Sequence, residues 1–291
     1  MDRRRIPVVG GVVRYRQDDG YNQSFALQWN RFKTTQIDAI SGSRDTLRRF
    51  QETTWRLDEL AGKRVLEAGC GPGRFTNLMA TAKARLVSFD YSAAIDANFE
   101  NHSAFENVVF LQADIFEMPF RDGVFDYVFC HGVLQHTPDP KVAFQALVRK
   151  LAPGGRISID VYRKDGKIRP WKSKYLWRWL TTRVKPEVLL QFLEWFIPKW
   201  LPLDTAIKRI PYLGNYLGSI IPCWNYDSRD LSAELKVTWA VMDTFDALAP
   251  AFDNPATLFE VRQWMADAEL VDVDVRPGGN GVVANGRKPV R

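Results

Sequence analysis

A turn rich in glycine carries the strongest chemical signal in the sequence. Gly69, Gly71 and Gly73 follow a short apolar segment, 64–68, which is predicted to be a strand and includes Glu67. Glycine has no Cβ atom, so the backbone of such a turn can approach a ligand closely. The spacing differs from the G-x-G-x-x-G of dinucleotide-binding turns, and no G-K-[ST] follows as in a P-loop. The turn therefore predicts a ligand site and disfavours a nicotinamide or flavin enzyme.

Two carboxylates follow the next two predicted strands. Asp90 ends the strand expected over 84–90, and Asp114 ends the strand expected over 108–114. A carboxylate can accept hydrogen bonds from both hydroxyls of a ribose, or from the exocyclic amine of adenine. Open α/β sheets bind their ligands at the carboxyl ends of the strands. These positions therefore predict that the glycine turn and the two acids line one ligand site.

The segments around these residues alternate between strand and helix patterns. Strands are predicted over 64–68, 84–90, 108–114, 125–131 and 156–162. Helices are predicted over 75–82, 92–98 (with Ser92 as the N-cap) and 138–151. Elements that alternate at intervals of about 20–30 residues are typical of right-handed βαβ units on a parallel sheet.

The chain after residue 256 continues this core. Thr257-Leu-Phe-Glu260 has the pattern of a capping box and predicts a helix through residue 269. The alternating segment 271–275, the turn 277–281 and the segment 282–284 predict an antiparallel hairpin. The predicted sheet is therefore mostly parallel and ends in a hairpin.

Basic charge and tryptophan concentrate in one part of an ordinary globular composition. The 291 residues are 46% hydrophobic and 25% charged, with 40 basic and 34 acidic side chains, which is not typical of disorder. Between residues 163 and 209 there are twelve Lys or Arg against four Asp or Glu, and five of the ten tryptophans. We predict four parts: an N-terminal arm over the site (1–55), a core (56–162), a basic, Trp-rich helical insertion (163–240), and the remainder of the core (241–291).

Several protein classes are disfavoured by composition. Cys70, Cys130 and Cys223 form no CxxC pair, which argues against a disulfide framework and a cysteine zinc site. No apolar stretch approaches the roughly 18 residues of a membrane-spanning helix. The apolar run 6–13 is short and broken by Pro and Gly, unlike a secretory signal. We expect a cytoplasmic protein without a metal site.

Five motifs in the expected order resemble the class I S-adenosylmethionine-dependent methyltransferases. They are Glu67-Ala-Gly-Cys-Gly-Pro-Gly73, Phe89-Asp90, Gln112-Ala-Asp114, His131-Gly-Val-Leu-Gln-His-Thr-Pro138 and Leu151-Ala-Pro-Gly-Gly155. The resemblance covers about residues 60–162 and 254–287. It implies a doubly wound, mostly parallel, seven-stranded Rossmann-like sheet with a C-terminal antiparallel hairpin. The segments 24–32, 243–246 and 253–255 further resemble a bacterial subgroup that often methylates small metabolites or saccharides, and in which the arm caps the cofactor.

The resemblance implies a role for each matched residue. The three glycines shape the turn beneath the methionine part of S-adenosylmethionine (SAM), and Glu67 attracts its ammonium group, directly or through water. Asp90 holds the ribose, Asp114 holds the adenine, and His131 faces the sulfonium and the acceptor. The other expected cofactor contacts are Cys70, Tyr91, Ser92, Ile115 and Gly132.

A hydroxyl acceptor needs a general base. His131, His136, Asp160 and Tyr162 lie at or just beyond predicted strand ends, and histidine has the most suitable unperturbed pKa, so we favour His131 or His136. The absence of an Asn/Asp-Pro-Pro-Tyr segment after the fourth strand disfavours methylation of amide or adenine amino nitrogens. The candidate substrate contacts are Trp29, Tyr162, Trp171 and Tyr226.

These patterns favour O-methylation of a small or saccharide-like acceptor. Methylation of carbon or nitrogen on another metabolite or on a lipid-linked acceptor, and a non-catalytic scaffold with the same fold, stay open. For the insertion, three interpretations remain: a helical lid with solvated cations, a surface for peripheral contact with a membrane through 163–236, and a nucleic-acid surface. The last is disfavoured because no known RNA-binding module accompanies it. The sequence does not predict an oligomeric state.

Overall fold

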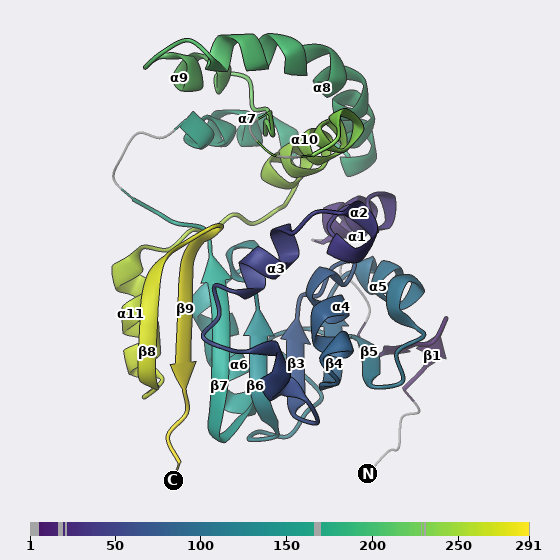
Figure 1. Ribbon diagram of the computed structural model, residues 1–291, viewed down its shortest axis with the longest axis vertical. Coiled ribbons are helices and arrows are strands. Elements are labelled where there is room, and N and C mark those ends of the chain that lie inside the picture. The colour runs from purple at the N-terminus through teal and green to yellow at the C-terminus, as the bar shows by residue number, and fades with distance from the viewer. Residues whose placement is uncertain are drawn as a thin grey trace.

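A single sheet forms the base of the molecule, with a group of helices above its carboxyl edge (Figure 1). The computed structural model describes residues 6–16, 20, 22–165, 170–227, 229 and 231–290. Within these residues the sheet has nine strands in the order β1-β2-β5-β4-β3-β6-β7-β9-β8. The strands are β1 (Val8–Val9), β2 (Val12–Arg14), β3 (Arg64–Ala68), β4 (Arg85–Asp90), β5 (Val108–Gln112), β6 (Phe125–Cys130), β7 (Leu151–Val161), β8 (Val271–Gly278) and β9 (Gly281–Arg287).

Seven of these strands form the predicted core. Strands β5, β4, β3, β6 and β7 are parallel, and β8 and β9 form the antiparallel hairpin, as predicted; β9 is the strand that pairs with β7. The sheet is wider than predicted, because β1 and β2 form a hairpin and β2 adds to β5 in parallel. Gly10 and Gly11 turn the hairpin with positive φ angles of 58° and 81°, and Val12 is fully buried. The glycines that argue against a secretory signal in this run are the residues that make the turn of the hairpin.

Two local predictions need correction. Strand β7 begins at Leu151, directly after the helix, and not at residue 156, so Pro153 and the two glycines after it lie within an extended segment. Ser92 is not the N-cap of its helix, which begins at Ala94. Its side chain donates instead to Asp90, at 2.7 Å. The Ser92 hydroxyl thus bridges the strand-end carboxylate and the helix start, because its oxygen also accepts from the amide of Ala94 at 3.2 Å.

Helices cover both faces of the sheet. They are α4 (Arg74–Thr81), α5 (Ala94–His102), α6 (Pro140–Lys150) and α11 (Leu258–Asp267). Neighbouring residues of β3 point to opposite faces: Val65 packs in a cluster with α4 and α5, and Leu66 packs in a cluster with α6 and α11. The capping box of α11 is formed as predicted, because Thr257 accepts from the Glu260 amide and Glu260 accepts from the Thr257 amide.

The N-terminal arm lies between the sheet and the upper helices. It contains α1 (Gln23–Arg31), α2 (Asp38–Ser41) and α3 (Asp45–Phe50), and the short 3-10 helix η1 (Leu57–Leu60) follows it at the start of the core. Glu52 ties the arm to the C-terminal hairpin, since its carboxylate accepts from the Gly279 amide (2.6 Å) and its carbonyl accepts from Arg276 (2.7 Å). The arm therefore joins the core and the insertion on one side of the molecule.

The insertion is helical and makes up the top of Figure 1. It contains η3 (Pro170–Ser173), α7 (Lys174–Thr181), α8 (Pro186–Lys208), α9 (Gly214–Gly218) and α10 (Ala233–Leu248); η2 (Leu134–His136) belongs to the core. The boundary predicted between residues 240 and 241 falls inside α10, and buried residues on both sides of it, Trp239 and Phe245, share one apolar cluster. The helical unit thus extends to Leu248. Among the described helices, none is long and apolar enough to cross a membrane.

Candidate functional site

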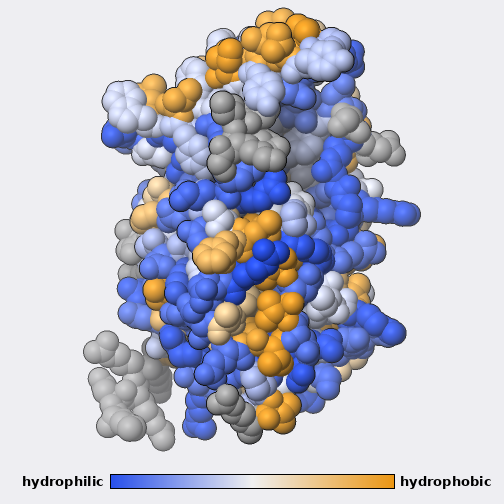
Figure 2. Space-filling model, turned by 90° about the vertical axis from the view of Figure 1, so that its left-hand side faces the viewer, coloured by the Kyte–Doolittle hydropathy of each residue, from blue (hydrophilic) through white to orange (hydrophobic). Residues whose placement is uncertain are grey.

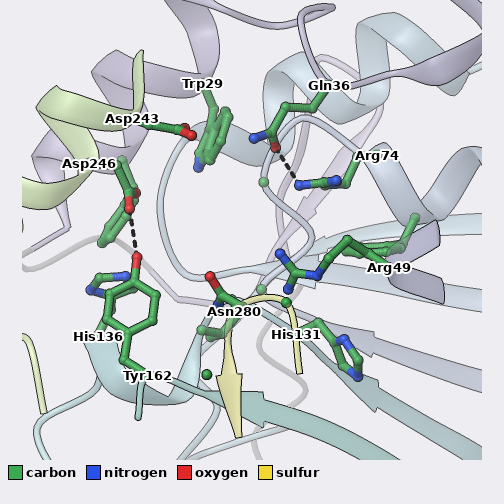
Figure 3. A pocket seen from close by; sticks show the side chains of 18 of the residues that line it. Trp29, Gln36, Arg49, Arg74, His131, His136, Tyr162, Asp243, Asp246 and Asn280 are labelled. Carbon is green, nitrogen blue, oxygen red and sulfur yellow. Dashed lines mark hydrogen bonds between the residues drawn. The ribbon is translucent and has the colours of Figure 1, made fainter. Parts of the chain in front are cut away.

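A cavity of about 970 Å³ separates the carboxyl ends of the strands from the helices of the insertion. Its floor consists of residues that follow β3, β4, β5, β6 and β7. The arm and the turn of the C-terminal hairpin form one side, and α10 with the segment before it forms the roof. Figure 3 shows side chains from all of these regions around the same space. The cavity is therefore where the sequence predicts the ligand.

The glycine turn has a backbone that only glycine adopts easily. Gly69 and Gly71 have φ angles of +69° and +53°. A Cβ atom on Gly69 would lie 2.3 Å from the side chain of Val133, and one on Gly71 would lie 3.3 Å from Nε1 of Trp29. The Gly71 amide donates to Asp90, at 3.0 Å. The turn thus brings bare backbone to the cavity and is tied to the end of β4.

Most of the predicted cofactor contacts border the cavity. Asp90 is held in place by Gly71 and by the amide of Ser92 (2.9 Å). The predicted cofactor residues that border the cavity are Gly69, Cys70, Gly71, Asp90, Tyr91, Ile115, His131 and Gly132.

Four predicted cofactor residues lie behind this surface. Gly73 is the N-cap of α4, where a Cβ atom would lie 2.0 Å from Asn98. Asp114 accepts from the Phe116 amide (2.8 Å) and lies 3.4 Å from Arg16. The others are Ser92, which is fully buried, and Glu67.

Glu67 is the buried acid beneath the turn. Its Oε2 accepts from Ser88 (2.8 Å) and from Thr76, whereas none of the described residues hydrogen-bonds its Oε1. Burial raises the pKa of Glu67 to about 7. The residue therefore supports the turn from within the core, and its second oxygen is the part of it that is left for a ligand or water.

The two candidate histidines have different surroundings. The imidazole of His131 is fully buried, with Nε2 2.9 Å from Ser158 and Nδ1 3.5 Å from Asp160, and Figure 3 shows it directed away from the cavity. Burial lowers the pKa of His131 to about 4, although Asp160 opposes this. Asp160, also a candidate base, pairs with Arg49 and accepts from the Gly132 amide. His131 and Asp160 therefore belong to a buried network.

His136 lies outside this buried network and is oriented by a backbone carbonyl. Its Nδ1 lies 3.0 Å from the carbonyl of Phe252. Because a carbonyl oxygen only accepts, Nδ1 carries the proton of the neutral ring and Nε2 is left with a lone pair. His136 borders the cavity and has ring contacts with Tyr162 (5.3 Å) and Phe25 (4.9 Å). Burial lowers its pKa, so the ring is neutral at neutral pH.

Comparison with known proteins agrees with this geometry. A family model described as a methyltransferase domain matches residues 66–159. The O-methyltransferase rstn1 of Aspergillus nomiae is 31% identical over 171 residues, which are 57% of this chain and 69% of that protein. The chain belongs to the class I S-adenosylmethionine-dependent methyltransferases.

Other relatives of this methyltransferase are similar over shorter regions. The tRNA U34 carboxymethyltransferase of Campylobacter curvus is 33% identical over 109 residues, or 36% of this chain and 37% of that protein. The chain covers 29%, 37% and 43% of the lengths of the first three curated relatives. The structure of an O-methyltransferase family protein from Burkholderia thailandensis has a TM-score of 0.50 at 12% identity, covering 92% of this chain and 63% of that one. This likeness supports the fold.

The roof of the methyltransferase cavity combines aromatic rings with two carboxylates. Asp243 and Asp246 lie three residues apart on α10, so they share a face. Asp243 accepts from the hydroxyl of Tyr226, and Asp246 accepts from that of Tyr162 at 2.9 Å (Figure 3). Burial raises the pKa of Asp243 to about 7. The aromatic residues around these carboxylates are Phe25 and Trp29 of the arm, Tyr162 after β7, and Trp224, Tyr226 and Trp239 of the insertion.

Three of the four predicted substrate residues meet here. Trp29, Tyr162 and Tyr226 border the cavity, whereas the side chain of Trp171 lies outside the described part of the chain. Sequence reasoning assigned no role to Asp243 and Asp246, although their spacing on a helix predicts a shared face. No local signal marks Arg49 or Asn280 as cavity residues, because the fold brings them there from the arm and the hairpin turn.

One carboxylate links three regions at the rim of the cavity. Asp45 of α3 pairs with Arg48 of the same helix, with Arg74 of α4 at 3.2 Å, and with Arg229 of the insertion at 3.3 Å. Burial alone would raise the pKa of Asp45, but the arginines lower it. The arm, the core and the insertion are thus joined through one side chain. Among the described residues, no group of three or more His, Cys, Asp or Glu is placed to hold a metal ion.

Proposed function

We propose that the protein transfers a methyl group from SAM to a hydroxyl group of a small, saccharide-like acceptor, with His136 as the general base. The observation that carries the proposal is the hydrogen bond from Nδ1 of His136 to the Phe252 carbonyl, which leaves Nε2 unprotonated at the cavity. An O-methyltransferase among the relatives supports the choice of oxygen.

The residues around the glycine turn fit SAM. Bare backbone at Gly69 and Gly71 can approach the methionine part closely; a Cβ atom on Gly69 would strike Val133, and one on Gly71 would lie 3.3 Å from Trp29. Asp90 borders the cavity and is fixed by Gly71 and Ser92, as an acceptor of ribose hydroxyls must be. Ala113 and Ile115 supply an apolar edge for the adenine. When bound, SAM supplies an activated methyl group on its sulfonium.

The chain contributes alignment and a proton acceptor. Nε2 of His136 takes the proton of the acceptor hydroxyl, and Nδ1 keeps its proton on the Phe252 carbonyl, so the charged ring is hydrogen-bonded from the start. Tyr162 packs edge-on against His136 and donates to Asp246, which fixes the ring from the other side. Such alignment is the main requirement of an in-line transfer.

The roof of the cavity supports a polyhydroxylated acceptor. Carboxylates accept hydrogen bonds from hydroxyl groups, and Asp243 and Asp246 present two of them on one helix face. Trp29, Trp224 and Trp239 offer flat apolar surfaces beside them. A ring with several hydroxyls and an apolar face matches this combination, whereas a flat hydrocarbon would offer no donor to the acceptor positions that Tyr226 and Tyr162 leave open on these carboxylates.

The test uses methyl-labelled SAM with a panel of glycosides, nucleotide sugars, phenols and total tRNA. We expect label on oxygen of a polyhydroxylated compound. The variant His136→Asn should then lower turnover by roughly 10²–10⁴-fold with unchanged SAM affinity by calorimetry, and His131→Asn should lower turnover much less. Full activity of His136→Asn, or labelling of nitrogen or RNA alone, would contradict the proposal. Failure to bind SAM at millimolar concentration would favour the scaffold alternative.

A further inference from the structure

Helix α7 and the segment around α9 carry an unusually apolar outer surface. We call the side chains Leu176, Trp177, Trp179, Leu180, Leu213, Tyr216, Leu217 and Ile220 the apical patch; each is more than a third exposed. Leu176 is 80% exposed and Trp179 is 71% exposed. The indole of Trp177 donates to the carbonyl of Ile220 at 2.8 Å, so the two segments are adjacent. Figure 2 shows apolar side chains gathered at this end of the molecule.

The apolar side of α7 faces outward because its inner side is polar and fixed. Arg178 donates to the carbonyls of Ala247 (3.2 Å) and Pro250 (2.7 Å). On the same inner face Lys174 pairs with Asp253, and Thr181 donates to the carbonyl of Leu248 at 2.9 Å. These contacts prevent the helix from turning its apolar side inward, because charged groups would then lose their partners. The exposure of Leu176 and Trp179 is therefore built into the fold.

The charge around the patch is positive. Arg183 follows Trp179 by one turn and lies over its ring, at 5.1 Å. On α8, Lys199 lies over the ring of Trp195 at 3.9 Å. Between residues 183 and 209 the exposed charged residues are Arg183, Lys185, Glu187, Lys199 and Arg209, of which Arg209 pairs with the exposed Asp227. Trp and Leu next to Lys and Arg are typical of helices that lie in the headgroup region of a membrane, and the excess of cations favours anionic lipid.

Helix α7 also connects this surface to the cavity. Lys174 and Tyr175 border the cavity, and the next residues of the helix, Leu176 and Trp177, belong to the patch. We propose that the apical patch binds the surface of an anionic lipid bilayer, with Leu176 and Trp179 in the boundary between headgroups and acyl chains. The cavity then opens beside the membrane surface. This inference is independent of the atom that is methylated.

The experiment is vesicle flotation of the full chain, with vesicles of phosphatidylcholine alone and with equal parts of phosphatidylcholine and phosphatidylglycerol. We expect flotation with the anionic vesicles that weakens as salt is raised. The double variant Leu176→Glu/Trp179→Glu should reduce the bound fraction by roughly tenfold or more. The double variant Arg183→Gln/Lys185→Gln should weaken binding roughly fivefold for each basic residue removed.

Phe259→Glu is the matched control. Phe259 is 73% exposed, and it lies on α11, outside the insertion that carries the apical patch. It should float like the unchanged chain, and all variants should keep the same melting temperature and SAM affinity. The proposal is overturned if the unchanged chain stays in the soluble fraction with both vesicles, or if the patch variants float equally well. Sedimentation velocity gives a second check: a dimer that dissociates with Leu176→Glu/Trp179→Glu would assign the patch to a second copy of the chain instead.

Discussion

Helix α6 of the core buries its apolar side chains, whereas helix α7 of the insertion buries polar ones and exposes its apolar ones. In α6 the buried side chains are apolar, Phe144 and Leu147 among them. In α7 the buried residues are Lys174, Arg178 and Thr181, and the largest apolar groups are exposed. The core is thus stabilised by burial of apolar surface, and α7 is positioned by hydrogen bonds and an ion pair. Hydrophobic periodicity therefore predicts the inner face of a helix only where the neighbouring element is itself apolar.

The largest expected effect is on the free energy of unfolding, and it should differ between substitutions in these two helices. Phe144 is fully buried, so Phe144→Ala should lower the free energy of unfolding by about 3–5 kcal/mol. Trp179→Ala removes an exposed ring and should change it by less than about 0.5 kcal/mol. Urea denaturation followed by far-UV circular dichroism measures both. If Trp179→Ala lowers the free energy of unfolding by more than about 1 kcal/mol, the ring must pack against the protein.

A pH dependence should distinguish the buried acid of the core. Burial raises the pKa of Glu67 from 4.5 to about 7. Between these pH values the folded chain keeps a proton that the unfolded chain has lost, so the free energy of unfolding falls as pH rises, by up to about 3 kcal/mol. Glu67→Gln cannot titrate, and its stability should fall less over the same window. Parallel curves for the two proteins, in urea titrations at several pH values, would contradict this.

Cofactor affinity should depend on the core and not on the exposed acids. Asp90→Ala removes the carboxylate between the glycine turn and the cavity, and we expect SAM affinity to fall roughly 10- to 100-fold. Asp267→Ala, which breaks a surface ion pair with Lys141, is the control and should bind normally. Titration calorimetry provides the comparison. Equal affinity of all three proteins would place the ribose elsewhere.

The smallest effect concerns one helix cap in each region. Ser232 caps α10 and Thr257 caps α11, and replacement of either by Ala should cost about 1 kcal/mol. If the insertion and the core unfold together, both variants shift one thermal transition in calorimetry. If Ser232→Ala shifts a separate transition at lower temperature, the insertion unfolds on its own, and the roof of the cavity is less stable than its floor.

The sequence was most informative where local pattern and tertiary burial agree. Alternation of strands and helices predicts the five parallel core strands, the hairpin pattern predicts β8 and β9, and Thr257 with Glu260 predicts the start of α11. The hairpin at Gly10 and Gly11 was missed, because a two-residue strand is too short to show a period. These elements depend on a neighbouring strand, β5, that the local sequence does not reveal.

The candidate site was predictable in position but not in orientation. A residue at or after the carboxyl end of a parallel strand is expected near the cavity, which holds for Asp90, Gly132 and His136 but not for Asp114. Whether its side chain points into the cavity depends on partners distant in sequence. Ser158 and Asp160 hold the ring of His131 in the core, and Phe252 orients that of His136. The roof formed by α10 depends on how the whole insertion folds back.

The ion pairs of Asp45 concentrate contacts between three regions of the chain at one carboxylate on the rim of the cavity. Arg74 and Arg229 come from opposite sides of the cavity and meet on this one carboxylate. Neutralising it would break one contact of the arm with the core and one with the insertion together, while Glu52 still accepts from Gly279 and Arg31 still pairs with Glu194. Higher ionic strength should therefore weaken the contacts of this carboxylate with both walls of the cavity at once.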